Sequence, residues 1–156
     1  MTMGLGERAR VMEILLVEDN PADIRLTKEA LKEADQKVNL NVVMNGVSAL
    51  QFLRTSGSSP DHPRPDLIIL DLNLPKKNGR EVLADVKGDP ELRTIPVVVL
   101  TTSTADEDIL TSYHLHANCY VHKPMDLERF IEVILSIQSF WYWMVVRPAE
   151  RIRDPW

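Results

Sequence analysis

The stretch Pro65-Asp66-Leu67-Ile68-Ile69-Leu70-Asp71-Leu72-Asn73-Leu74-Pro75 decides the fold of this chain. Its apolar run, residues 67–70, does not alternate polar with apolar side chains, which predicts a strand buried on both faces of a sheet. Pro75 and the turn signal Asn78-Gly79 end any continuation as a strand. Ligands bind just beyond the carboxyl ends of the strands in open parallel sheets. Asp71 therefore lies where a reactive group is expected.

Four further apolar runs predict strands, and helical spacing follows each strand. The predicted strands cover residues 13–17, 40–44, 67–70, 95–100 and 118–122. Asn20-Pro21 is interpreted as a turn, and the predicted helices cover residues 23–34, 46–53, 80–87 and 106–116, with a last helix that begins near Asp126. Five strands that alternate with five helices need crossover connections. The sequence thus predicts an α/β fold, a doubly wound five-stranded parallel sheet with helices on both faces.

Size and composition narrow the classes of protein further. We expect an N-terminal extension at residues 1–11, one globular domain at 12–138 and a C-terminal extension at 139–156. The C-terminal extension is too short for a DNA-binding domain of the common helix-turn-helix type. The net charge of −5 does not favour DNA, and no apolar run approaches the ~20 residues of a membrane span. The single cysteine, Cys119, excludes an internal disulfide and suits a cytoplasmic protein.

Four of the predicted strands end in charged or polar residues. Glu18-Asp19 follows the first strand and Asp71 follows the third, while Thr101 and Lys123 end the fourth and fifth. All of them fall at one edge of a doubly wound sheet, where the three carboxylates would repel one another. A divalent cation would relieve this repulsion, and an acidic site made of oxygens suits Mg²⁺. A carboxylate, a metal, a cation and a hydroxyl donor are what phosphoryl transfer needs.

These residues resemble the receiver domains of two-component response regulators, a family with a flavodoxin-like fold. The resemblance covers about residues 12–138, and it implies that Asp71 accepts a phosphoryl group from a histidine kinase. The matching elements are Glu18-Asp19, Asp71 within Leu70-Asp71-Leu72-Asn73-Leu74-Pro75, Asn78-Gly79, Thr101-Thr102 and Tyr120-Val121-His122-Lys123-Pro124.

The resemblance also implies a metal site. Asp19 and Asp71 would bind Mg²⁺ together with the backbone carbonyl of Asn73, and Glu18 would act through a water molecule. The cofactor expected for this chain is therefore Mg²⁺.

Further roles concern the phosphoryl group itself. Lys123 would contact the phosphoryl oxygens, and Thr101 would move to bond one of them. A rotamer change of Tyr120 would accompany that movement. The resemblance further implies a cis peptide bond between Lys123 and Pro124.

A narrower resemblance is to the small stand-alone regulators that are paired with bacterial phytochromes. It implies that a bacteriophytochrome is the kinase partner of this chain. The stretches that carry it are residues 73–83, 95–103 and 118–120 and the phrase Ser139-Phe140-Trp141.

Four consecutive aromatic residues follow the expected domain: Phe140, Trp141, Tyr142 and Trp143. Adjacent residues point in different directions around a helix, so a continuing helix would expose two of the four. Large exposed aromatic side chains usually mark an interface. We expect a homodimer that forms through residues 139–156. The alternative is that these aromatic side chains pack against their own domain.

Three functions are compatible with these residues. The first is a phosphoacceptor that signals through a phosphorylation-dependent surface or dimer change and catalyses only its own phosphorylation and dephosphorylation. The second is a phosphate-independent interaction scaffold, which the acidic cluster disfavours because unused like charges destabilise a fold. The third, a magnesium-dependent phosphohydrolase, would need a second acid two residues after Asp71, where Asn73 stands.

Overall fold

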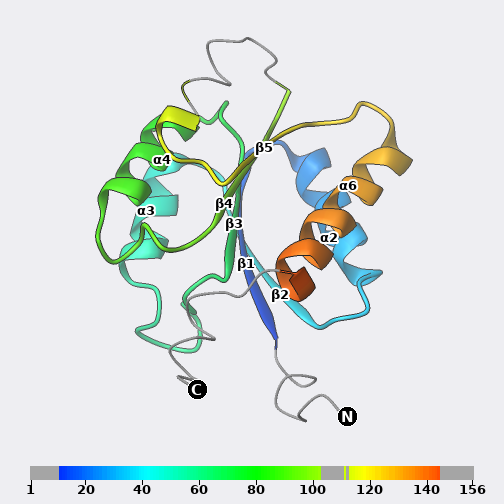
Figure 1. The fold of residues 1–156 in the computed structure, drawn as a ribbon, viewed down its shortest axis with the longest axis horizontal. Helices are drawn as coiled ribbons and strands as arrows, with labels where there is room; N and C mark the ends of the chain where they lie inside the picture. The colour runs from blue at the N-terminus through cyan, green and yellow to red at the C-terminus, as the bar shows by residue number, and fades with distance from the viewer. Residues whose placement is uncertain (1–10, 103–110, 112, 145–156) are drawn as a thin grey trace.

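A computed structural model of the chain describes residues 11–102, 111 and 113–144. Its five strands are all parallel and form one sheet in the order β2-β1-β3-β4-β5 (Figure 1). The chain leaves β1 for β2 on one side and later returns to β3 on the other, so the switch in strand order lies between β1 and β3. The strands are β1 (Met12–Val17), β2 (Val38–Val43), β3 (Leu67–Leu70), β4 (Val97–Thr101) and β5 (Cys119–His122).

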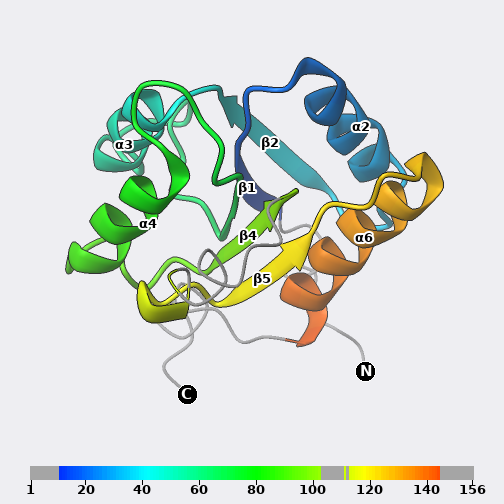
Figure 2. The ribbon, with the colours of Figure 1, turned by 90° about the horizontal axis from the view of Figure 1, so that it is seen from above.

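Helices cover both faces of the sheet. Helices α2 (Pro21–Lys32) and α6 (Leu127–Ser139) lie side by side on one face, and α3 (Gly46–Arg54) and α4 (Gly79–Gly88) lie on the other (Figures 1 and 2). This arrangement confirms the predicted doubly wound, flavodoxin-like fold. Four α-helices are described where five were predicted, because residues 103–110 and 112, most of the remaining predicted helix, lie outside the described ranges. None of the described helices has the length and apolar character that a membrane span requires.

Alternate strand residues belong to two separate hydrophobic cores. In β1, Leu15 and Val17 pack into the core under α3 and α4, whereas Ile14 and Leu16 pack into the core under α2 and α6. The central strand β3 is at most 1% exposed at every residue, which confirms that both of its faces are buried. Because neighbouring residues point to opposite faces, a shift of one residue would exchange the contents of the two cores.

Several element boundaries differ by one or two residues from the sequence prediction, and proline explains two of these differences. Asn20 is the N-cap of α2, and Pro21 is its first residue, so the helix begins earlier than the predicted turn allowed. Proline suits that position because its missing N–H would have no partner there. Strand β4 begins after Pro96 rather than at Ile95, since proline cannot donate a hydrogen bond within a sheet.

The start of α4 is fixed closely against the end of β3. Asn78 caps the helix, and Glu81 closes a capping box with it. Gly79 donates its N–H to the carbonyl of Leu72 at 3.0 Å. A Cβ atom at Gly79 would approach the backbone of Asp71 and Leu72 more closely than real Cβ contacts allow. The glycine therefore lets the helix approach the residue that follows β3.

The aromatic residues after α6 form a short π-helix, η1 (Phe140–Met144). Trp141 and Tyr142 are half-buried and pack against the core under α2 and α6. Phe140 and Trp143 are 51% and 52% exposed. Two of the four aromatic side chains are thus exposed, as the sequence predicted, and the other two pack on their own domain. The rest of the predicted extension, residues 145–156, lies outside the described residues.

Candidate functional site

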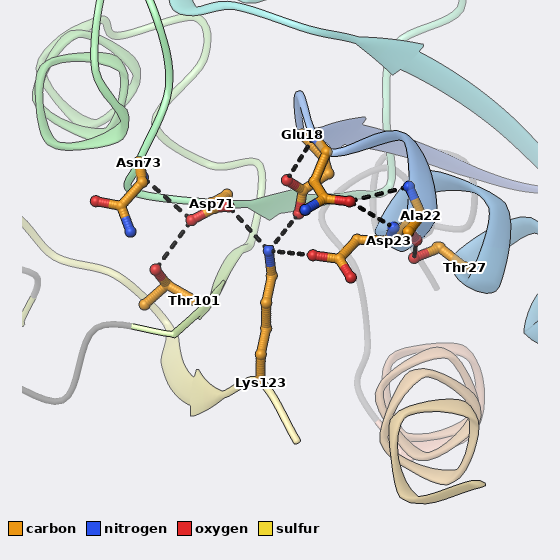
Figure 3. Close-up of polar contacts among 9 residues, drawn as sticks. Glu18, Ala22, Asp23, Thr27, Asp71, Asn73, Thr101 and Lys123 are labelled. Carbon is orange, nitrogen blue, oxygen red and sulfur yellow. Dashed lines mark hydrogen bonds and ion pairs between the residues drawn. The ribbon is translucent and has the colours of Figure 1, made fainter. Parts of the chain in front are cut away.

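The predicted site residues converge at the carboxyl ends of the strands (Figure 3). Glu18 follows β1, Asp71 follows β3, Thr101 ends β4, and Lys123 follows β5. Backbone hydrogen bonds continue the sheet to this edge: the N–H of Asp71 donates to the carbonyl of Val17 at 3.0 Å, and that of Lys123 to the carbonyl of Thr101 at 2.8 Å. The parallel sheet itself therefore brings together residues that are distant in the sequence.

The ammonium of Lys123 lies at the centre of the site. Its Nζ atom is 2.6 Å from Glu18 Oε1, 2.9 Å from Asp23 Oδ2 and 2.9 Å from Asp71 Oδ2. An ammonium has three N–H donors, so these carboxylates engage all of them. Burial alone would lower the pKa of Lys123, but the hydrogen bonds to the three carboxylates outweigh burial and raise the pKa. The lysine is thus held as a cation although it is only 5% exposed.

Both oxygens of the Asp71 side chain are held in place. Oδ1 accepts hydrogen bonds from the hydroxyl of Thr101 at 2.9 Å and from the backbone N–H of Asn73 at 3.1 Å. Oδ2 accepts from Lys123 at 2.9 Å. Asp71 is only 6% exposed, so its position is fixed by protein groups rather than by water. Protein groups thus hold this carboxylate in one orientation.

Glu18 shows the cost of placing an acid in this buried site beside a second carboxylate. Burial, and after it the charge of Asp71, raise the pKa of Glu18 to about 7, although the hydrogen bond from Lys123 opposes the rise. One oxygen each of Glu18, Asp19 and Asp71 lie within 4.8 Å of one another, with Asp19 the more exposed of the three. Carboxylate oxygens are the ligands that a hard divalent cation prefers, and such a cation would supply the missing positive charge. The residues present therefore fit a divalent metal.

Tyr120 is a residue of β5, three positions before Lys123. It pairs with Val99 in the sheet, and its half-buried side chain packs against the core under α3 and α4. Its part in a rotamer change stays a prediction, as does the use of the Asn73 carbonyl as a metal ligand. The expected cis bond before Pro124 is wrong, because this peptide bond is trans. The trans form is the favoured one, by about 0.5–1 kcal/mol for a bond before proline.

Sequence reasoning missed one residue of the site, Asp23. This residue is in the first turn of α2, and its carboxylate reaches Lys123 at 2.9 Å (Figure 3). The available signal was its position three residues after Asn20, the N-cap, where an acidic residue favours the helix start. That signal alone does not distinguish a capping residue from one that faces the site.

Known proteins resemble this chain over most of its length. A family model described as "Response regulator receiver domain" matches residues 14–135. The response regulator Rcp1 of Synechocystis sp. is 49% identical over 136 residues, which are 87% of this chain and 92% of Rcp1.

Solved structures agree with the sequence matches. The crystal structure of the phosphorylated cyanobacterial phytochrome response regulator RcpA is 47% identical with a TM-score of 0.84, and the match covers 89% of this chain and 99% of RcpA. The crystal structure of the Mn²⁺-bound form of Rcp1 is 48% identical with a TM-score of 0.81, covering 88% of this chain and 99% of Rcp1.

Proposed function

This chain belongs to the response regulator receiver family and is related to the phytochrome response regulators, and from that membership we propose that Asp71 accepts a phosphoryl group from a histidine kinase. In this transfer the P–N bond of the kinase phosphohistidine breaks, and its electron pair stays on the histidine nitrogen. An oxygen of Asp71 forms the new P–O bond. The observation that carries the proposal is the position of the Lys123 ammonium, 2.9 Å from Asp71 Oδ2.

The groups around Asp71 have distinct tasks in this proposal. Lys123 offsets the charge that the phosphoryl oxygens bring, because its raised pKa keeps it cationic. Thr101 already donates to Asp71 and can donate to a phosphoryl oxygen instead. The N–H of Asn73 holds Asp71 Oδ1 during the reaction. Tyr120 would follow the movement of Thr101.

Mg²⁺ is the cofactor that we propose for this site. Asp19, Asp71 and the backbone carbonyl of Asn73 would hold it, with Glu18 acting through water. When bound, a divalent cation neutralises charge on the phosphoryl oxygens. The Mn²⁺-bound structure of the relative Rcp1 supports a divalent metal in this family. The clustered oxygens of Glu18, Asp19 and Asp71 support it in this chain.

We propose a bacteriophytochrome as the kinase, because RcpA, at 47% identity, is a cyanobacterial phytochrome response regulator. The phosphorylated protein would pass on the signal through its surface or through a change in its dimer. It would act in the cytoplasm and would bind neither DNA nor a membrane. The alternative is a phosphate-independent scaffold, a function that would not require the hydrogen bonds that orient Asp71.

Replacing Asp71 with asparagine tests the proposed function. With Mg²⁺ and a small-molecule phosphoryl donor such as acetyl phosphate, the wild-type mass should rise by about 80 Da, one phosphoryl group. Asp71→Asn should gain none, because an amide oxygen is a poor nucleophile. Asp35→Asn, at an exposed position before β2, is the matched control and should gain the full mass. A wild-type protein that gains no mass would favour the scaffold instead.

The exposed aromatic pair supports a proposed homodimer. Phe140 and Trp143 each leave about half of their area in solvent, and burying such side chains is a main source of binding energy at interfaces. We expect the double substitution Phe140→Ser with Trp143→Ser to reduce the mass seen by light scattering from dimer to monomer. Met44→Ser removes a similarly exposed side chain, 49% exposed after β2, and should leave the mass unchanged. An unchanged mass in the double variant would contradict this role of the pair.

A further inference from the structure

Helices α2 and α4 begin with the same pattern, an asparagine N-cap and an acidic residue three positions later. In α4, Glu81 accepts the N–H of Asn78 at 3.1 Å and closes a capping box. In α2, the N–H of Asn20 instead donates to Glu18 Oε2 at 3.2 Å. Asp23, the residue that corresponds to Glu81, directs its carboxylate to Lys123. Capping therefore does not account for the side chain of Asp23.

The backbone holds Asp23 firmly at this place. Its N–H donates to the side chain of Asn20 at 3.2 Å, and its carbonyl accepts from the hydroxyl of Thr27 at 2.8 Å (Figure 3). Thr27 is only 1% exposed. Two local hydrogen bonds thus fix the backbone of Asp23, from which its carboxylate reaches Lys123.

Asp23 differs from the other two acceptors of Lys123. Its side chain is 23% exposed, whereas those of Glu18 and Asp71 are 4% and 7% exposed. It also lies outside the group of carboxylates whose oxygens cluster closely enough to hold a metal. Asp23 is therefore the acceptor that water can replace most readily when Lys123 turns to another partner.

We propose that Asp23 is a positioning residue that holds the Lys123 ammonium in the unphosphorylated protein and thereby weakens the binding of a phosphoryl group at Asp71. This inference rests on the proposed function. All three N–H groups of Lys123 are engaged by carboxylates, so a phosphoryl oxygen must take one from an existing partner.

Two physical effects of Asp23 act in the same direction. Its carboxylate competes with the phosphoryl oxygens for the ammonium, which stabilises the unphosphorylated state. Its negative charge also repels the anionic phosphoryl group, since both lie beside the same lysine. Removing the negative charge of Asp23 should therefore favour the phosphorylated state, because both the competition for Lys123 and the repulsion of the phosphoryl group would be lost.

Beryllofluoride, an analogue of the phosphoryl group that binds to a carboxylate, measures this preference at equilibrium. At saturating Mg²⁺, Asp23→Asn should bind beryllofluoride about fivefold more tightly than the wild-type protein, the size expected for a partly exposed ion pair. The aspartyl phosphate formed from acetyl phosphate should also be lost more slowly. The NMR signal of the Lys123 ammonium should shift in the free variant, which a purely structural role of Asp23 would not require.

Glu29→Gln is the matched control, because it removes the same charge from an exposed position of α2. It should leave the affinity for beryllofluoride and the Lys123 signal unchanged. Asp23→Ser, which keeps a good residue for a helix start, replaces Asp23→Asn if that variant does not fold. Unchanged or weaker beryllofluoride binding in the Asp23 variants, relative to Glu29→Gln, would overturn the role of Asp23 alone. A wild-type protein that binds no beryllofluoride would overturn the proposed function as well.

Discussion

Replacing Lys123 with methionine is expected to lower the free energy of unfolding by about 3–5 kcal/mol at pH 8 without divalent ions, the usual loss when one partner of a buried ion pair is removed. Methionine fills a similar volume but leaves Glu18 and Asp71, both buried, facing each other without a cation. Urea unfolding followed by circular dichroism measures the change.

The loss should depend on pH with a definite sign. The pKa of Glu18 is about 7 in the folded protein, above that of an ordinary glutamate, so the folded state binds this proton more tightly than the unfolded chain does. The contribution of Glu18 to the unfolding free energy therefore increases as the pH falls from about 7 to about 4.3, the value of a free glutamate. Without Lys123 this proton is held still more tightly, so the deficit of Lys123→Met should shrink towards pH 5.

Two controls isolate the ion pairs from the loss of a lysine as such. Lys28→Met removes an exposed lysine of α2 and should change the unfolding free energy by no more than about 0.5 kcal/mol. Adding Glu18→Gln to Lys123→Met removes one uncompensated charge and should recover part of the loss. Full stability of Lys123→Met at pH 8 would mean that Lys123 does not offset the carboxylates.

The second large effect is expected at Gly79, where alanine should lower the unfolding free energy by about 3 kcal/mol, the upper part of the range for an overpacked interior. The added methyl group would meet the backbone of Asp71 and Leu72, which cannot move aside as the end of a side chain can. The clash would also displace Asp71 from Thr101 and Lys123. The same variant should thus take up a phosphoryl group more slowly, as measured by intact mass over time.

Gly88, the last residue of the same helix, provides the matched control. Beyond the neighbouring residues and backbone of the helix itself, no atom lies within 4 Å of the Cβ that alanine would add there. Gly88→Ala should therefore be neutral or stabilise the protein by up to about 1 kcal/mol, through the better helix propensity of alanine. Equal effects at the two glycines would show that the contact with Asp71 is not what requires Gly79.

The fold and most of the site could be predicted because both follow from strand ends. Uninterrupted apolar runs identify buried parallel strands, and parallel strands present their carboxyl ends at one edge. This rule alone predicts that Glu18, Asp71, Thr101 and Lys123 lie together at that edge.

Other features depend on contacts that no local pattern specifies. An acidic residue at position 23 favours the start of the helix and can equally form an ion pair with Lys123. The sequence alone does not distinguish these two roles. Asn20 and Pro21 suit a turn as well as a helix start, which is why the sequence pattern predicts a first helix that begins two residues too late. The π-helix at Phe140–Met144 continues α6 without a breaking residue between them, so the sequence carries no sign of the change.

The distance along the chain between the partners of the site has a consequence for biosynthesis. Glu18 and Lys123 are 105 residues apart, and a growing polypeptide folds from its amino-terminal part onwards. The carboxylates are made long before the lysine that compensates them. A protein cut short before β5 would carry the repelling acids without the Lys123 ammonium, and we expect cellular proteases to degrade it before it can occupy a kinase.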